Sequence, residues 1–213
     1  MDTLGLQKDT KSALLDCAEQ LFLEKGFERV SIREITEAAG ANVAAVNYYF
    51  TSKTNLYRAF ISRRFATITR RKVSLLKGLL ASNEPPTLNQ VVAVFVRSYF
   101  DDMLESKDSE RLLQLVFSEM DADAIASDLV IRELVVPIHT AMLDAMKAAT
   151  PSLAESHLSH CISSIVGQVL HFIRARDVMK AVSWRDAGDD YTEQVIEHIT
   201  EFSLRGIGSG SNA

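Results

Sequence analysis

The sequence predicts an all-α protein with an N-terminal helix-turn-helix head of three helices and a larger C-terminal helical domain. Few helix breakers interrupt the chain, because its 213 residues include only 4 Pro and 9 Gly, and three of these Gly lie in the last eight residues. Apolar residues recur with a period near 3.6 in successive segments, and no segment has a convincing strand pattern. Two short helix signals are joined by Ala39-Gly40-Ala41, a connection of helix-turn-helix length.

The first helix is predicted over residues 10–25. Its apolar positions have the i, i+3, i+4, i+7 spacing of an amphipathic helix, at Leu14, Cys17, Ala18 and Leu21. Gly26 follows at the position where glycine commonly ends a helix.

Two short helices follow. Ser31-Ile32-Arg33-Glu34 has the pattern of a capping box, and Val30 and Ile35 flank it as a hydrophobic staple. Gly40 ends this second helix. Asn42 is then placed to cap a third helix over residues 43–49.

The fourth helix begins after Thr51 or Ser52, either of which could cap it, and Asn83-Glu84-Pro85-Pro86 ends it. Further helices are predicted over residues 87–105, 109–121, 127–149, 152–179 and 190–206. Pro137 should bend or interrupt the third of these. We therefore divide the chain into a head over residues 1–50, a helical domain over 51–206 and a disordered tail over 207–213, whose composition resembles a linker.

The composition excludes several classes of protein. Hydrophobic residues make up 47% of the chain and charged residues 24%, a balance typical of a globular protein. Two cysteines cannot form a disulfide framework, which favours a reducing compartment. No apolar run reaches the length of a membrane span, and the start lacks a signal-peptide pattern. We expect a cytoplasmic protein without a membrane partner.

The charge distribution is uneven along the chain. The net charge is −5, yet residues 38–83 contain eight basic side chains and no acidic one. Such a stretch predicts an anionic partner, although pairing with acidic neighbours in the fold would explain it equally well. Within it, Arg63, Arg64, Arg70 and Arg71 are expected on a solvated face, and Arg58 is the one arginine near enough to the head for a distal DNA contact.

Residues 40–57, GANVAAVNYYFTSKTNLY, resemble the TetR family of bacterial transcriptional regulators, and the likeness extends back through residues 18–35. The form NVAAVNYYF at residues 42–50 is similar to a smaller branch of that family. The resemblance covers about residues 10–60. It implies a ligand-responsive repressor, not an enzyme, that binds a palindromic operator in double-stranded DNA as a homodimer and is released by a small hydrophobic ligand.

The residue chemistry of the head agrees with DNA binding. Val43, Ala44 and Ala45 are small enough to let a helix approach base edges in a major groove. Lys53 lies at a helix start, where the helix dipole disfavours a cation unless an anion such as a phosphate binds there too. Asn47 could contact either an adenine edge or a phosphate, and this choice stays open. The expected DNA contacts are Ser31, Arg33, Asn42, Val43, Ala44, Ala45, Asn47, Tyr48, Tyr49 and Lys53.

The larger domain should hold the ligand pocket and the dimer interface. Bulky or adaptable side chains on apolar faces are the predicted pocket lining, with Tyr99 and His139 as polar anchors: Phe65, Ile68, Phe95, Tyr99, Phe117, Met120, His139 and Met142. Packing of the domain core would explain any one of these residues equally well. A stripe of small residues at 159, 163 and 167, set in an apolar face, predicts close approach of another helix, which the resemblance implies comes from a second protomer, although packing within the chain is the alternative. The expected interface residues are Leu158, Ser159, Ile162, Ser163, Val166, Gly167 and Leu170.

Two alternatives remain at this stage. His157, His160 and Cys161 have the spacing of metal ligands on one helix face, but no second segment offers partners, so we expect no metal and no cofactor. The sequence contains no phosphate-binding loop, His-Glu-x-x-His motif or nucleophile elbow. An all-α small-molecule-binding protein or enzyme with a purely structural head is the competing hypothesis.

Overall fold

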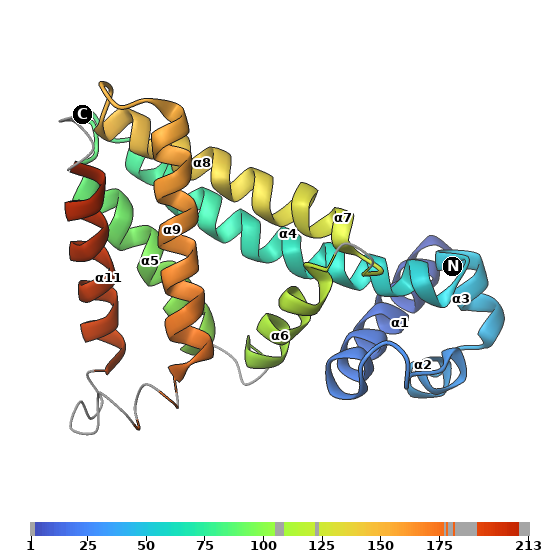
Figure 1. Ribbon diagram of the computed structural model, residues 1–213. Helices are drawn as coiled ribbons and strands as arrows, with labels where there is room; N and C mark the ends of the chain where they lie inside the picture. The colour runs from blue at the N-terminus through green and yellow to red at the C-terminus, as the bar shows by residue number, and fades with distance from the viewer. Residues whose placement is uncertain are drawn as a thin grey trace. The chain divides into compact units, whose positions relative to one another are not determined.

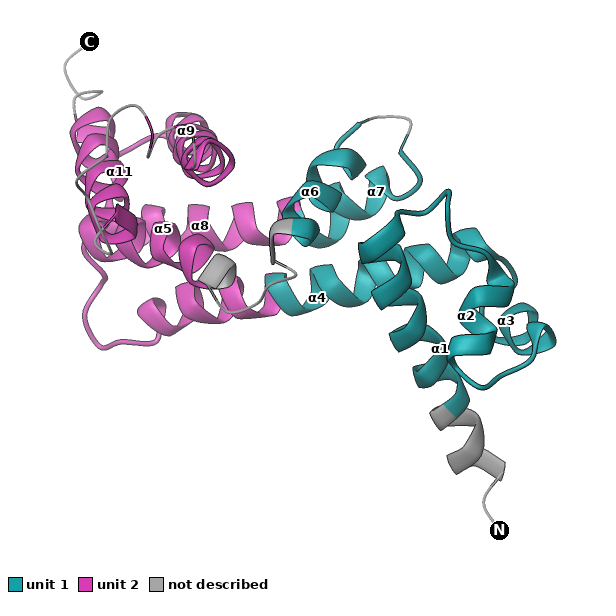
Figure 2. Ribbon diagram, turned by 90° about the horizontal axis from the view of Figure 1, so that it is seen from below, with its two compact units in different colours: residues 1–68, 107–134 teal, residues 69–106, 135–213 magenta. Residues whose placement is uncertain are grey.

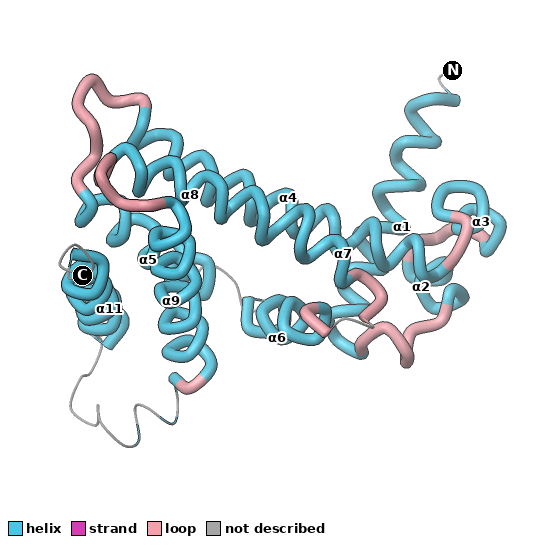
Figure 3. The backbone as a smooth tube through the Cα atoms, turned by 45° about the horizontal axis from the view of Figure 1, so that its top comes forward, coloured by secondary structure: helices cyan, strands magenta, loops and turns pink. Residues whose placement is uncertain are grey.

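The computed structural model describes residues 3–104, 109–121, 124–176, 178, 181 and 191–208. These residues are helical apart from turns and loops, and none of them lies in a strand (Figure 3). No helix in this part of the chain is both long and apolar enough to cross a membrane. The helices shown in Figure 1, with the π-helix η1, are α1 (Thr3–Lys25), α2 (Ile32–Ala38), α3 (Val43–Phe50), α4 (Lys53–Leu80), α5 (Leu88–Leu104), α6 (Ser109–Glu119), α7 (Ser127–Leu129), η1 (Val130–Val135), α8 (Val136–Ala149), α9 (Glu155–Arg174) and α11 (Tyr191–Gly208).

Local capping determines where the short helices begin. The Ser31 hydroxyl accepts a hydrogen bond from the Glu34 amide at 3.2 Å, and the Glu34 carboxylate accepts one from the Ser31 amide at 2.8 Å, so the predicted capping box is confirmed. Asn42 caps α3 by accepting from the Ala45 amide at 2.9 Å. Ser52 caps α4 by accepting from the Asn55 amide at 3.1 Å. Gly40, at φ +60°, provides the left-handed residue between α2 and α3.

The chain folds into two compact units (Figure 2). One contains Met1–Ile68 and Lys107–Leu134, and the other contains Thr69–Ser106 and Val135–Ala213. This division differs from the predicted boundary after residue 50. The reason is packing, because apolar residues of the first half of α4 lie in the same core as the head: Leu56, Tyr57, Phe60, Ile61 and Phe65.

The core of the first unit extends from the head into α6, α7 and η1. Phe22 of α1, Ile35 of α2 and Val46 of α3 form one buried cluster with Leu129 and Val130. Leu115 and Val116 of α6 pack against it. Residues far apart in the sequence therefore stabilise the head together.

Pro137 interrupts the predicted helix over residues 127–149, as expected. The backbone runs as α7, then as the π-helix η1, and returns to α-helical geometry in α8, with Pro137 in its first turn. Proline has no N–H and its ring clashes with the carbonyl four residues earlier, so a wider turn just before it relieves the conflict.

The second unit has its core between α5, α8, α9 and α11. Their buried residues include Phe95, Met142, Leu158, Val169 and Ile199. Helix α11 continues to Gly208 and buries Ile207, so the expected tail does not begin at residue 207. Residues 209–213 lie outside the described part of the chain.

Candidate nucleic-acid interface

Helix α3 has one face in the core and one face in solvent. Val46 and Phe50, one turn apart, are buried in the core of the first unit. Tyr48, on the opposite side, retains 71% of its accessible surface, and Val43, the first residue of the helix, is also exposed. Ala44 and Asn47 are exposed on the same helix. A short helix with a small-residue, solvent-facing surface is suited to a DNA major groove.

The other candidates on and just before α2 and α3 differ in the exposure of their side chains and in whether their polar atoms already form hydrogen bonds. Ala45 and Tyr49 are half-buried and pack against the core. Ser31 and Asn42 are exposed, but their side-chain oxygens already cap the helices that follow them. Arg33 is exposed, and its Nε donates to Glu37 Oε1 at 2.8 Å. All ten predicted DNA contacts stay predictions, with Ser31 and Asn42 having a structural role as well.

Lys53 is the first residue of α4 and is half-buried. Its Nζ lies 4.1 Å from the ring centroid of Phe27, a cation–π distance. Lys53 thus belongs to the first turn of α4, whose backbone N–H groups have no acceptor within the helix, although Ser52 already accepts from that of Asn55. An anion such as a phosphate would interact with both the ammonium and these N–H groups at this point.

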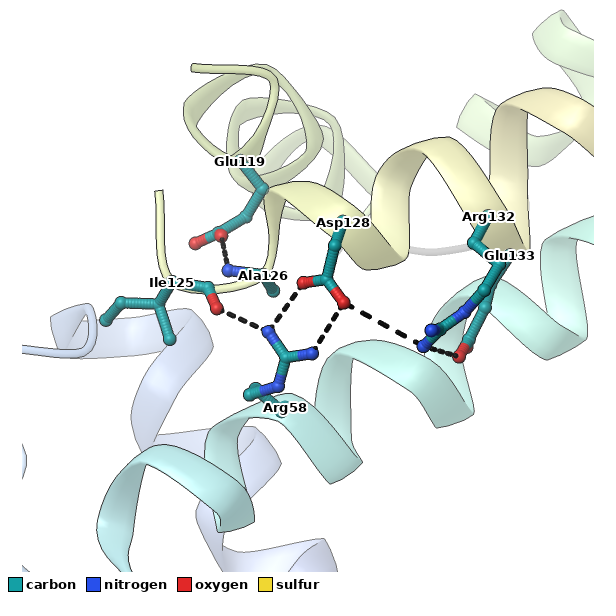
Figure 4. A network of polar contacts seen from close by, with 7 residues as sticks. All are labelled: Arg58, Glu119, Ile125, Ala126, Asp128, Arg132 and Glu133. Atoms are coloured by element: carbon teal, nitrogen blue, oxygen red, sulfur yellow. Dashed lines mark hydrogen bonds and ion pairs between the residues drawn. The ribbon is translucent and has the colours of Figure 1, made fainter. Parts of the chain in front are cut away.

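Three of the eight basic side chains in the stretch over residues 38–83 pair with carboxylates of the first unit. Arg58 forms a two-pronged ion pair with Asp128, at 2.7 Å for both bonds (Figure 4). Arg63 pairs with Asp16 and Glu19, and Arg64 pairs with Glu19. The expectation that Arg63 and Arg64 lie on a solvated face is therefore wrong, and Arg58 is committed to an internal contact. Their acidic partners lie outside the stretch, so for these three arginines the alternative explanation, pairing with acidic neighbours in the fold, is the one that holds.

A buried polar contact connects α4 with α6. Glu119, at the end of α6, is only 5% exposed. It accepts a hydrogen bond from the Tyr57 hydroxyl at 2.7 Å and another from the Ala126 amide at 2.6 Å. Burial and this contact with Glu119 raise the pKa of Tyr57, so the phenol remains a donor. Sequence analysis missed both residues, because 62 positions separate them.

The predicted pocket residues are distributed over both units. Phe65, Ile68, Phe117 and Met120 belong to the first unit, and Phe95, Tyr99, His139 and Met142 belong to the second. Met120 is 54% exposed, so it is not a buried wall of a cavity in this structure. Tyr99 lies under the buried Lys72, whose Nζ is 3.7 Å from its ring centroid. The pocket as a whole stays a prediction.

The predicted interface residues on α9 fall into two groups. Leu158 and Ile162 are buried in the core of the second unit, so they cannot form an exposed contact surface. Ser159, Val166 and Leu170 are half-buried, and Ser163 and Gly167 are exposed. An exposed aromatic ring that the sequence analysis missed lies on α11, at Phe202, which is 61% exposed.

Among the described residues, no group of three or more His, Cys, Asp or Glu side chains is placed to hold a metal ion. His157 Nε2 and Cys161 Sγ lie 3.6 Å apart as a pair. Burial raises the pKa of the Cys161 thiol, which disfavours the thiolate that a metal would require.

Two family models match the chain. Residues 14–60 match the model of bacterial regulatory proteins of the tetR family, and residues 88–207 match that of the C-terminal domain of the HTH-type transcriptional dual regulator CecR. The second match alone spans more than half of the chain. The protein belongs to the TetR family. It is accordingly a DNA-binding transcriptional regulator, and the exposed α3 lies within the residues that match the tetR-family model.

Individual TetR-family proteins show the same likeness along the chain. This chain is 24% identical to the dual regulator CecR of Shigella flexneri over 218 residues, which cover 96% of this chain and 95% of CecR. It is 26% identical to the probable regulator YttP of Bacillus subtilis over 119 residues, covering 56% of this chain and about half of YttP, 54%.

Solved TetR-family structures share the fold. A regulator from Mesorhizobium loti superposes with a TM-score of 0.70 at 13% identity, over 98% of both chains. SmeT, the repressor of the multidrug efflux pump SmeDEF of Stenotrophomonas maltophilia, gives 0.64 at 15% identity, over 93% of this chain and 91% of SmeT. RolR in complex with resorcinol gives 0.53 at 17% identity, over 98% and 96%.

Proposed function

We propose that this TetR-family protein is a ligand-responsive repressor that binds a palindromic operator as a homodimer in the cytoplasm and is released by a small hydrophobic molecule. The observation that carries the DNA-binding half is the solvent-facing surface of α3, with Tyr48 71% exposed, next to Lys53 at the start of α4. Two heads are needed, because one head contacts too little of the groove, and dimeric helix-turn-helix proteins bind half-sites about 34–36 Å apart.

The names of similar proteins support the regulatory half. SmeT is a repressor, and RolR was solved with resorcinol, a small aromatic molecule. CecR is described as a dual regulator, so activation at some promoters is the second candidate function. The competing hypothesis, a small-molecule-binding protein or enzyme whose head is purely structural, has no comparable support.

Of the predicted lining, Phe65, Ile68 and Phe117 belong to the first unit, so the proposed ligand site is limited to the second unit, at Phe95, Tyr99, His139 and Met142. Its aromatic and apolar side chains suit a hydrophobic ligand, and Tyr99 and His139 would supply polar anchors. Met120 is left out because it is exposed.

The decisive experiment is selection of an operator from random DNA, followed by measurement of the Kd for operator and unrelated DNA across a salt series. We expect a two-fold symmetric operator and an affinity that falls steeply with salt. Lys53→Ala should weaken binding to both DNAs and lower the salt slope by about 1. Lys77→Ala, which removes the same charge from an exposed position on the same helix, is the matched control. Equal effects of the two variants, or an asymmetric selected sequence, would count against the proposal.

A further inference from the structure

Tyr57 lies at the centre of an aromatic cluster in the first unit. Its ring is 5.1 Å from the Phe22 ring and 5.0 Å from the Phe27 ring, both in edge-on geometry, and 5.9 Å from the Phe60 ring. These rings come from α1, from the turn after it and from α4. The position of the Tyr57 ring therefore constrains the position of Phe27.

The hydroxyl of Tyr57 is fixed from the opposite side. Glu119 accepts its hydrogen bond at 2.7 Å and uses its second oxygen for the Ala126 amide, which lies just before α7. The neighbouring Arg58 donates to the Ile125 carbonyl at 2.6 Å and to Asp128 (Figure 4). Two consecutive residues of α4 thus hold the described residues between α6 and α7.

The Phe27 ring has a second neighbour. Lys53 Nζ lies 4.1 Å from its centroid, and Lys53 precedes Tyr57 by one turn of α4. Phe27 is therefore in contact with the phenol ring of Tyr57 and with the ammonium of Lys53. A continuous series of contacts leads from Glu119 through Tyr57 and Phe27 to Lys53, all within one compact unit.

We propose that Tyr57 and Glu119 are positioning residues for DNA binding, because they hold the Phe27 ring on which the Lys53 ammonium rests. The inference depends on the proposed contact between Lys53 and a DNA phosphate. A lysine held on a ring loses less conformational freedom on binding than a freely rotating one, so fixing the ring raises affinity.

A double-mutant cycle tests this coupling directly. The Kd for the selected operator and its salt slope are measured for wild type, Lys53→Ala, Tyr57→Phe and the double variant. Removing the Tyr57 hydroxyl leaves the Glu119 carboxylate without that donor. We expect Tyr57→Phe to weaken binding by about three- to tenfold and to lower the salt slope. In the Lys53→Ala background, the same change should have no further effect.

Two further variants separate positioning from general stability. Glu119→Gln keeps the side-chain volume and one acceptor oxygen, so it should weaken binding in the same direction as Tyr57→Phe but by less. Ser62→Ala removes the hydrogen bond from Ser62 to Glu133, at 2.6 Å, which also connects α4 with η1 but is not part of the series. Ser62→Ala should keep wild-type affinity and salt slope.

The outcomes distinguish this inference from the proposed function. If Lys53→Ala binds like wild type, the DNA contact is wrong and the positioning role falls with it. If Lys53→Ala weakens binding but Tyr57→Phe does not, or if their effects are additive, the DNA contact stands and the positioning role is overturned. A loss of affinity in Ser62→Ala equal to that in Tyr57→Phe would likewise overturn it.

Discussion

Glu34 connects the start of α2 with the end of α1. Its carboxylate accepts hydrogen bonds from the Ser31 amide and the Ser31 hydroxyl, both at 2.8 Å, and from Lys25 Nζ at 3.0 Å. The backbone hydrogen bond from Ser31, with Lys25 as the next contribution, lowers the pKa of Glu34 from 4.5 to about 2. A pattern of four residues, Ser31 to Glu34, was sufficient to predict the cap, but Lys25 could be added only from the structure.

Glu34 should make the stability of the first unit depend on pH. Its carboxylate has a lower pKa in the folded protein than in the unfolded chain, so its stabilising contribution is complete above pH 4.5 and is lost as the pH falls toward 2. Glu34→Gln should lower Tm most at neutral pH, and the difference from wild type should shrink below pH 4.5. Glu84→Gln, in the exposed turn after α4, is the control for loss of one charge. A Tm difference that is constant from pH 7 to 2.5 would contradict the role of the cap.

At the scale of the element, α3 separates structural positions from candidate contact positions. The four-residue spacing of Val46 and Phe50 puts both in the core, and Asn47 falls on the exposed side. Asn42 precedes the helix, and its side-chain oxygen accepts a hydrogen bond from the Ala45 amide. The same residue type therefore has two different roles five positions apart.

Substitution of each asparagine by alanine should separate these roles. Asn42→Ala removes a helix cap and should lower the free energy of unfolding by about 1 kcal/mol, and Asn42→Ser should restore most of it. Asn47→Ala should change stability by less than about 0.5 kcal/mol, because the residue is exposed. If Asn47 contacts a base, discrimination at one operator position should fall by about 1–3 kcal/mol. Urea unfolding and binding to single-base operator variants measure the two effects, and a uniform loss over all sequences would instead assign Asn47 to a phosphate.

At the scale of the whole molecule, the surface of the second unit suggests how two protomers meet. Phe202 is 61% exposed on α11, and its ring lies 6.1 Å from that of His198, which is in turn 5.9 Å from Phe172 on α9. Gly167 on α9 has no atom within 4 Å of the position that a Cβ would occupy. Exposed rings and an open glycine on α9 and α11 leave room for another helix, and we propose these residues as part of the dimer interface.

Gly167→Leu should shift the protein toward monomer without loss of stability in the protomer. The residue is exposed, and a Cβ there meets no neighbouring atom of the described chain within 4 Å, so we expect the larger side chain to clash with a second copy. Sedimentation at micromolar concentration measures the shift. Gly78→Leu, at a second open glycine on α4, is the matched control and should remain dimeric. A monomeric wild type would refute the homodimer, and a dimeric Gly167→Leu would place the interface elsewhere.

The sequence by itself determined the features that depend on neighbours within a few residues. Helix periodicity, the Ser31–Glu34 box, the Asn42 cap and the interruption at Pro137 are all local, because backbone hydrogen bonds and caps join residues at most about four positions apart. Tertiary structure decided what the charged and polar side chains do. The acid-free stretch was compatible with a DNA-facing surface or with internal ion pairs, and the fold pairs Arg58 and Arg63 with carboxylates 70 and 47 positions away. Composition can count such charges, but only the folded chain determines which of them meet, since side chains pair by distance in space rather than along the sequence.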